Sequence, residues 1–397
     1  MDENKEKELN ENQDQKKFQF GNVLTISIAH HLHDIFSSFL APLLPLLIEK
    51  LSISYSLAGM LTVFQRVPAL ANPLIGLVAD KLPVRYILIC APSITAIVMS
   101  LLGSAPSYIV LVILLFIAGI SSALFHVPAP VMVTRVAGNR IGKGMSFFMF
   151  GGEMARTVAP PAILGAVSLW GLEGTYKMIP FGIVSSLLLF IRLHNIKISE
   201  DFKKKQKESS VNRTLKQFMR TFVIIAGIFF FTSIMKSALA AFLPTYLTGK
   251  GESLWAGGIA LSVLQLAGAA GAFFSGTLSD KLGRKKILFI MVFVSPILMW
   301  LFVEVGGIFT IALLILMGLF LFGVTPVTLA IVNEIKTDRP SFVNGVYMTI
   351  NFVFGSMSVP LVGLLADWLG METAYLISAV FVFGAIPFII MLPRDKS

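Results

Sequence analysis

Long apolar runs separated by short polar connectors fill most of this chain. A helix of about 20 residues is long enough to cross the hydrocarbon core of a bilayer. Twelve runs reach roughly this length, and they cover residues 20–48, 54–78, 86–104, 108–135, 144–168, 174–193, 219–247, 254–278, 287–304, 308–333, 343–366 and 372–392. The pattern predicts an all-α membrane protein with twelve transmembrane helices.

A polar segment between the sixth and seventh runs divides the twelve into two groups of six. The expected organisation is a cytoplasmic tail (1–19), an N-terminal bundle (20–193), a cytoplasmic linker (194–218), a C-terminal bundle (219–392) and a short tail (393–397). The first 17 residues are hydrophilic, and the apolar run behind them is too long for the core of a signal peptide. No cleavable signal is therefore expected.

Composition supports a lipid environment. Only 14% of the residues are charged and the mean hydropathy is +0.81, whereas about 25% of residues are charged in soluble proteins. The formal net charge of +10 raises the question of nucleic acid, but 26 of the 32 Lys and Arg residues fall on one side of the predicted helices, the side of both termini. This asymmetry marks the cytoplasmic side. We therefore expect a prokaryotic inner-membrane protein with both termini in the cytoplasm and no nucleic-acid partner.

The two halves of the chain resemble each other at an offset of 200 residues. "VFQRVPALANPLIGLVADKLPVRYIL" begins at Val63, and "VLQLAGAAGAFFSGTLSDKLGRKKIL" begins at Val263. Gln65 thus corresponds to Gln265, and Pro160 to Pro360. Parallel repeats of six helices are typical of secondary transporters that bind substrate near the membrane midplane.

The segment "GTLSDKLGRKK", residues 276–286, resembles the loop motif of the major facilitator superfamily, and "GLVADKLPVRY" at 76–86 resembles a degenerate copy. The resemblance implies two six-helix pseudo-repeats and alternating access, and we expect a monomer. It also assigns a gating role to the motif residues Gly76, Asp80, Arg85, Gly276, Asp280, Arg284 and Lys285. The alternative is that these residues only fix the topology of the loops.

A narrower resemblance links the chain to the fosmidomycin-resistance group of that superfamily. It rests on "AHHLHDIFSSFLAPLLPLL" (29–47), on "LFHVPAPVMVTRVAGNRIGKGMSFFMFGG" (124–152) and on the "PLIGLVADK" region. The resemblance implies proton-driven export of a small phosphonate antibiotic. This chain departs from the group where Val127 separates the Phe-His pair from Pro128, and where Glu153 and Arg156 interrupt the Gly-rich helix.

Five charged residues lie deep inside predicted helices: Asp34, Arg66, Glu153, Arg156 and Lys236. Each costs about 3 kcal/mol at the centre of a membrane helix unless it is paired or hydrated. Such residues usually face a bundle interior or a water-filled cavity. We therefore expect them to line the transport pathway.

Helical spacing groups some of these residues. His30, His33 and Asp34 share one helix face, and Glu153 lies one turn before Arg156. The offset of 200 places Asp34 near Lys236 in depth, so the two could meet across the pathway.

The expected proton-coupling residues are Asp34, as first choice, then Glu153, with His30 and His33 beside them. The expected substrate contacts are Arg66, Arg156, Lys236, His126, Gln65 and Gln265. Arg can hold a carboxylate or phosphonate with two hydrogen bonds.

Structural roles are the alternatives. Glu153 and Arg156 could form a static pair, and Lys236 could only neutralise Asp34. His30 and His31 could only satisfy backbone carbonyls or water. The two glutamines could only join helices.

The sequence thus predicts a proton-coupled exporter of a small organic anion or drug, with protons and the substrate as its partners. An importer of an organic anion is the first alternative, since direction depends on the gradients. A divalent-metal carrier is the second, because His30, His33, Asp34, His126 and Glu153 are all possible ligands. Three nearby cations and the lack of a chelating spacing argue against it, so no metal site is expected. With no P-loop or G-x-S-x-G motif, neither an enzyme nor a cofactor is expected.

Overall fold

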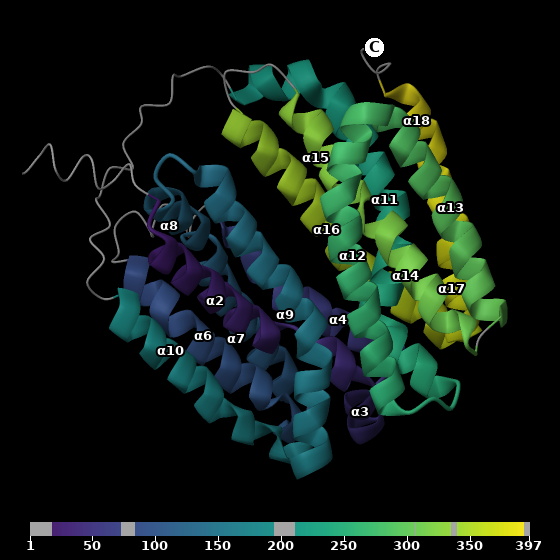
Figure 1. The fold of residues 1–397 in the computed structure, drawn as a ribbon. Coiled ribbons are helices and arrows are strands. Elements are labelled where there is room, and N and C mark those ends of the chain that lie inside the picture. Colours follow the sequence, from purple (N-terminus) through teal and green to yellow (C-terminus); the bar gives the residue numbers. More distant parts are fainter. Residues whose placement is uncertain (1–17, 73–83, 194–210, 306, 335–339, 393–397) are drawn as a thin grey trace, which may run out of the picture. The chain divides into compact units, whose positions relative to one another are not determined.

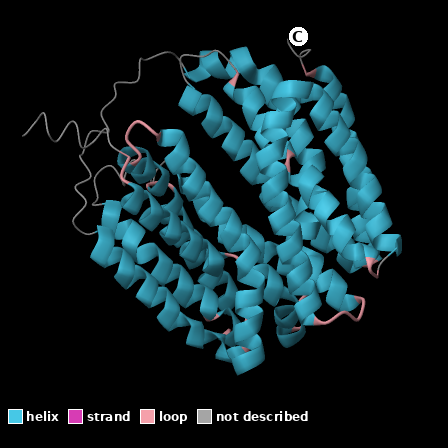
Figure 2. Cartoon of the chain, viewed as in Figure 1, coloured by secondary structure: helices cyan, strands magenta, loops and turns pink. Residues whose placement is uncertain are grey.

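A computed structural model describes residues 18–72, 84–193, 211–305, 307–334 and 340–392. All regular structure in these ranges is helical, and no strand occurs in them (Figure 2). The helices lie along the apolar runs of the sequence. Nine helical segments of the described residues are long and apolar enough to cross a membrane, and Leu88–Ser104 forms a shorter apolar segment. The count of twelve spans stays a prediction.

Contacts divide the chain into two compact units. The first consists of Met1–Leu40 and Phe64–Lys203, and the second of Ala41–Val63 and Lys204–Ser397. Residues 41–63 therefore group with the second unit, although they precede the linker in sequence.

The first unit is built around neighbouring helices that run side by side in purple, blue and teal in Figure 1. They are α2 (Phe20–Ser37), α6 (Val84–Ser100), α7 (Tyr108–His126), α8 (Ala129–Val136), α9 (Ile141–Trp170) and α10 (Ile179–Leu193). Helix α2 packs against α6, α9 and α10. Buried apolar side chains such as Ile26, Leu88 and Phe125 join these helices into one core.

The second unit contains α11 (Val211–Gly249), which is the longest helix of the described residues with 39 residues (Figure 1). The helices that follow it are α12 (Leu254–Leu282), α13 (Arg284–Val305), α14 (Phe309–Phe322), α15 (Val324–Asn333), α16 (Pro340–Leu369), α17 (Met371–Val382) and α18 (Ile386–Met391). Helices α11 and α16 pack around a core that includes Ile225, Phe229 and Tyr347. Most of α3 (Leu40–Leu51) and of α4 (Tyr55–Arg66) also belongs to this unit.

Helices α2 and α9 approach closely because α9 has two successive glycines at the contact. A Cβ on Gly151 would lie 2.6 Å from the carbonyl oxygen of Ser27, and a Cβ on Gly152 would lie 2.5 Å from Cε1 of His30. Neither distance leaves room for a side chain. The Gly-rich stretch that the sequence showed therefore serves to bring α9 against the histidines of α2.

A proline ends the helix that carries His126. Helix α7 stops at His126, and α8 begins at Ala129, directly after Pro128. Proline cannot donate a backbone hydrogen bond and clashes with the preceding turn, so it ends the helix here. The break leaves His126 in the last turn of α7.

The first turn of α4 is held by a carboxylate from α16. Asp367 Oδ1 accepts the backbone N–H of Tyr55 at 2.7 Å, and Oδ2 accepts that of Ser56 at 2.9 Å. A carboxylate at this position satisfies N–H groups that have no partner within the helix. Glycines extend the contact, because Gly59 faces the backbone of Pro360, and Gly363 faces that of Tyr55.

Several large apolar side chains of α10 are exposed. Ile183, Leu187 and Ile191 are between 49% and 58% exposed, and their spacing of four residues places them on one side of the helix. Trp368 in α16 is 75% exposed and Trp300 in α13 is 54% exposed. Such surfaces are favourable in lipid and unfavourable in water. With nine helices able to span a bilayer among the described residues, the chain is an integral membrane protein.

Candidate functional site

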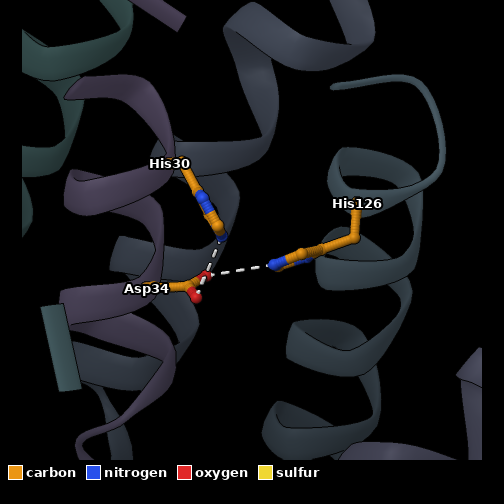
Figure 3. A group of neighbouring side chains, drawn as sticks. All are labelled: His30, Asp34 and His126. Carbon is orange, nitrogen blue, oxygen red and sulfur yellow. Dashed lines mark ion pairs between the residues drawn. The ribbon is translucent and has the colours of Figure 1, made fainter. Parts of the chain in front are cut away.

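Asp34 is the centre of a largely buried group of histidines, which we call the histidine–aspartate cluster: His30, His33, Asp34 and His126. Figure 3 shows three of its members, His30, Asp34 and His126. His30 lies one turn before Asp34 on α2, and its Nε2 is 3.2 Å from Asp34 Oδ2. His126 reaches Oδ1 from α7 through its Nε2, at 3.3 Å. His33 Nδ1 lies 3.0 Å from Oδ1. Asp34 itself is only 4% exposed.

In two of these histidines, the ring nitrogen that does not face Asp34 forms a hydrogen bond with a backbone carbonyl. His30 Nδ1 lies 2.7 Å from the carbonyl oxygen of Phe148, and His126 Nδ1 lies 2.9 Å from that of Ser122. A carbonyl oxygen can only accept, so each Nδ1 must carry the proton of its ring. In a neutral imidazole the other nitrogen then has a lone pair. His30 and His126 would thus direct lone pairs at a carboxylate.

A chain of hydroxyl groups fixes the same arrangement for His33. Ser121 Oγ donates to the carbonyl of Ala91 at 2.9 Å, and Thr95 Oγ1 donates to Ser121 Oγ at 2.9 Å. Thr95 must therefore accept from His33 Nε2, which lies 3.0 Å away. When His33 is neutral, its Nδ1 also directs a lone pair at Asp34.

An added positive charge would therefore stabilise the cluster. One carboxylate and three lone pairs repel one another, and burial keeps water from relieving the repulsion. A proton on an imidazole turns one of these contacts into a charge-assisted hydrogen bond. A metal ion could also bind the lone pairs. The arrangement is thus a site for a small cation.

Aromatic rings cover most of the cluster. The ring of His30 stacks on Phe148 with centroids 4.0 Å apart, and that of His33 stacks on Phe125 at 4.5 Å. The side chain of His126 is 36% exposed, whereas that of His33 is fully buried. His126 is therefore the member through which a proton or an ion can enter.

A second charged group lies on α9. Arg156 Nη1 contacts Glu153 Oε1 at 2.6 Å, and the two side chains are 43% and 28% exposed. Arg156 also interacts electrostatically with Asp34 and with Arg66. Exposed charges in a membrane helix face water rather than lipid, so this face of α9 borders water. Arg156 is thus in electrostatic range of both Asp34 and Arg66, and all three lie in the first unit.

The predicted polar contacts of the second unit lie on α11 and α12. Lys236 Nζ is 3.5 Å from Thr325 Oγ1 and 4.6 Å from the centroid of the Phe322 ring. Gln265 Oε1 has no hydrogen-bond partner in the described part of the chain. The expected pairing of Lys236 with Asp34 involves both units and stays a prediction.

Gln65 and His31 have structural contacts. Gln65 Nε2 donates to the carbonyl of Ser37 at 2.9 Å, across the break in the first apolar run. His31 Nδ1 bonds to the carbonyl of Gly151 at 2.9 Å, and this bond joins α2 to α9. The alternative of a backbone-satisfying histidine fits His31, whereas His30 also reaches Asp34.

The second copy of the loop motif forms a compact network. Arg284 pairs with Asp280, and its Nη2 lies 2.9 Å from Glu334 Oε1. Its Nη1 donates to the carbonyl of Gly276 at 3.2 Å. Lys285 Nζ donates to the carbonyl of Ile390 at 2.6 Å. In the first copy, Gly76 and Asp80 lie outside the described residues, and only the backbone of Arg85 is described, in α6.

Sequence reasoning missed the groups that orient the cluster. Thr95 and Ser121 are ordinary polar residues in apolar runs, and the carbonyls of Phe148 and Ser122 have no sequence signal. Ser122 precedes His126 by one helical turn, which is the only hint that the sequence offers.

Comparison with known proteins places this architecture in a family. The family model described as Major Facilitator Superfamily matches residues 26–358 and 256–397. The chain belongs to the major facilitator superfamily. Its members are transporters and not enzymes, which confirms that part of the sequence-based prediction.

Curated relatives in this superfamily match over almost the whole chain. The fosmidomycin resistance protein of Escherichia coli (strain K12) is 26% identical over 369 residues, or 91% of this chain and 90% of that protein. The uncharacterized MFS-type transporter YfnC of Bacillus subtilis (strain 168) is 25% identical over 94% of this chain and 93% of its own length. The predicted resemblance to the fosmidomycin-resistance group is thereby confirmed.

Solved transporters share the fold. A bacterial homolog of the human lysosomal transporter Spinster, in an inward-facing and unoccupied conformation, matches with a TM-score of 0.78 at 14% identity, over 95% of this chain and 97% of its own. The nucleoside transporter NupG matches with a TM-score of 0.75 at 17% identity, over 94% of this chain and all of its own.

Proposed function

We propose that this major facilitator is a proton-coupled exporter of small anionic, phosphonate-like molecules. It has twelve spans with both termini in the cytoplasm, and it works as a monomer in a prokaryotic inner membrane by alternating access between its two six-helix bundles. The histidine–aspartate cluster carries this proposal, because its buried lone pairs and carboxylate would be stabilised by an added positive charge. A proton supplies that charge during the transport cycle.

The neighbouring cations supply the substrate site. Arg156 and Arg66 have exposed side chains and interact electrostatically with each other, and Arg156 interacts with Asp34. An anion that binds the two guanidinium groups competes with Asp34 and Glu153 for Arg156. A proton on the cluster reduces the negative charge of Asp34, so binding of the anion and release of the proton influence each other. Lys236 and Gln265 of the second unit are the further substrate contacts in this proposal.

Similarity to named proteins supports the direction of transport. The Escherichia coli relative is named for fosmidomycin resistance. The multidrug resistance efflux pump PmrA of Streptococcus pneumoniae (strain ATCC BAA-334 / TIGR4) is 22% identical over 66% of this chain. Export of a small antibiotic-like molecule is therefore preferred over import.

Proton flux in inverted membrane vesicles tests the proposal. The vesicle interior is acidified, and a quenched dye reports loss of the gradient when small phosphonates are added outside. Wild type should give dequenching that Asp34→Asn lacks, because the amide cannot supply the carboxylate that holds the proton. His31→Gln is the matched control, since His31 lies outside the cluster, and it should respond like wild type.

Two results would change the proposal. A phosphonate response that persists in Asp34→Asn would move the proton to Glu153. No response to any small anion in wild type, in vesicles that demonstrably contain the protein, would remove proton-coupled anion export altogether.

A further inference from the structure

The donor atoms of the histidine–aspartate cluster have the spacing of a metal site. His30, Asp34 and His126 each offer one ligand atom, and all three atoms lie within 4.8 Å of one another. The two imidazole nitrogens are 3.2 Å and 3.3 Å from carboxylate oxygens (Figure 3). With metal–ligand bonds of 2.0–2.1 Å, two ligands of a tetrahedral ion are about 3.3 Å apart. The carboxylate can therefore share an ion with each histidine after only small side-chain adjustments.

His30 and His126 each form, through Nδ1, the kind of hydrogen bond that metal-binding histidines form. Each Nδ1 donates to a backbone carbonyl, of Phe148 for His30 and of Ser122 for His126. This bond fixes the tautomer in which Nε2 is free to bind a metal, and it fixes the orientation of the ring. Ligands whose lone pairs already point inward need little reorganisation.

The chemistry of the three ligands selects the ion. Two imidazole nitrogens and one carboxylate suit Zn²⁺ and related transition metals, whereas Mg²⁺ and Ca²⁺ prefer sites made entirely of oxygen. The partly exposed ring of His126 provides an entry path. Arg156 lies in electrostatic range of Asp34, but its charge is already paired with Glu153.

We propose that His30, Asp34 and His126 bind one divalent transition-metal ion of the Zn²⁺ class, which takes the place of the proton in the cluster and blocks transport. Metal binding stands on the geometry alone, whereas the block rests on the proposed function. Spacing along the chain could not reveal this site, because the third ligand comes from α7, far from α2 in sequence.

Cobalt binding to the purified protein tests the site. Co²⁺ is titrated into the full chain in detergent, and its visible absorption reports nitrogen coordination. We expect one ion per chain, displacement by an equal amount of Zn²⁺, and no displacement by Mg²⁺. Loss of an outer-shell group costs about 10–100-fold in metal affinity, so His126→Ala, which removes a ligand, should cost more than that.

Matched variants separate coordination from misfolding. His31→Gln should bind Co²⁺ like wild type, because His31 bonds only to the α9 backbone in the described structure. His126→Gln keeps a polar side chain of similar size at the partly exposed position, and it should lose the cobalt spectrum while eluting as the wild type does on size exclusion. Wild-type protein that is folded and gives no nitrogen-type cobalt spectrum would overturn the site, as would an unchanged spectrum in His126→Gln.

Transport in vesicles tests the block separately. Zn²⁺ added with a phosphonate should suppress dequenching in wild type over the concentration range in which it binds the purified protein. Dequenching that is insensitive to Zn²⁺ would overturn the block, and so would dequenching driven by Zn²⁺ alone, which would make the metal a cargo. If cobalt binds and no anion ever moves protons, the proposed function fails while the metal site stands.

Discussion

The corresponding helices α2 and α11 show how differently the two repeats are used. At an offset of 200 residues, His30 corresponds to Phe230 and Asp34 to Ile234. His30 bonds to the carbonyl of Phe148 on α9, whereas Phe230 packs against the ring of Phe354 on α16, with centroids 5.6 Å apart. The same helix pair is thus a polar interface in the first unit and a mainly apolar interface in the second, where Ser237 Oγ donates to the carbonyl of Gly355.

This difference between the two interfaces predicts where substitutions have the larger effect. A polar interface in a membrane protein depends on every hydrogen bond being made, so one substitution there has a large effect. An apolar interface tolerates exchanges of similar volume. Variants that remove a hydrogen bond of the histidine–aspartate cluster, or that add a side chain at the α2–α9 contact, should therefore disturb transport and stability more than variants of α11–α16. His31→Gln stays a control because its amide can still donate to the carbonyl of Gly151.

The largest effect is expected for Asp34→Asn, and the double variant Asp34→Asn/Glu153→Gln is its comparison. If the cluster alone holds the proton, the single change already reduces phosphonate-driven proton release to background. The double variant then adds nothing in the same vesicle assay. A residual signal in Asp34→Asn that disappears only in the double variant would mean that both Asp34 and Glu153 can carry the proton.

Gly152→Ala should be the next largest change. The new Cβ would lie 2.5 Å from Cε1 of His30, so α2 and α9 must separate or His30 must leave the cluster. Overpacking of this kind costs about 1–3 kcal/mol, and we expect a lower thermal unfolding temperature and weaker proton release.

Gly165→Ala on the same helix is the matched control for that change. No atom lies within 4 Å of a Cβ at this position, so the substitution should be neutral or slightly stabilising. Equal losses in both variants would show that the α2–α9 contact is not the cause.

Tyr347→Phe probes the second unit. The hydroxyl donates to the carbonyl of Thr325 at 2.7 Å and lies 3.1 Å from Thr328 Oγ1. Loss of one such bond costs about 1 kcal/mol, while the ring keeps its apolar contacts. The unfolding temperature should fall slightly and proton release should persist. Loss of transport with unchanged stability would give the second repeat a chemical role.

Lys250→Gln should have the smallest effect. Lys250 pairs with Glu372 at the surface, and the hydrogen bond to that carboxylate raises the pKa of Lys250. A lysine whose pKa is raised by folding stabilises the fold fully when the pH is below the ordinary lysine pKa. This stabilisation is lost only as the pH rises through the raised pKa. Between pH 5 and 8 the contribution is therefore constant, and an exposed pair is worth about 0.2–1 kcal/mol. A Tm loss as large as that of Gly152→Ala would contradict this.

The sequence was sufficient for the all-helical membrane class of the fold, since the length of the apolar runs decides where helices form in a membrane. The count of twelve spans stays a prediction. It also placed His30, His33 and Asp34 on one face, because helical spacing is local. It could not show that His126 completes the cluster, since that contact joins α2 to α7. Nor could it assign protons to ring nitrogens, which depends on backbone carbonyls and on the hydroxyls of Thr95 and Ser121.

The cap that Asp367 provides for α4 affects whether the chain can be produced as two separate fragments. The loop after the sixth helix would be the natural place to cut the gene into two, yet residues 41–63 belong by their contacts to the second unit. An N-terminal fragment would carry these residues without the carboxylate that holds Tyr55 and Ser56. A C-terminal fragment would keep Asp367 and lose the helix that it caps. The two fragments should therefore be stable only when they are synthesised together, as complementing halves of one membrane protein.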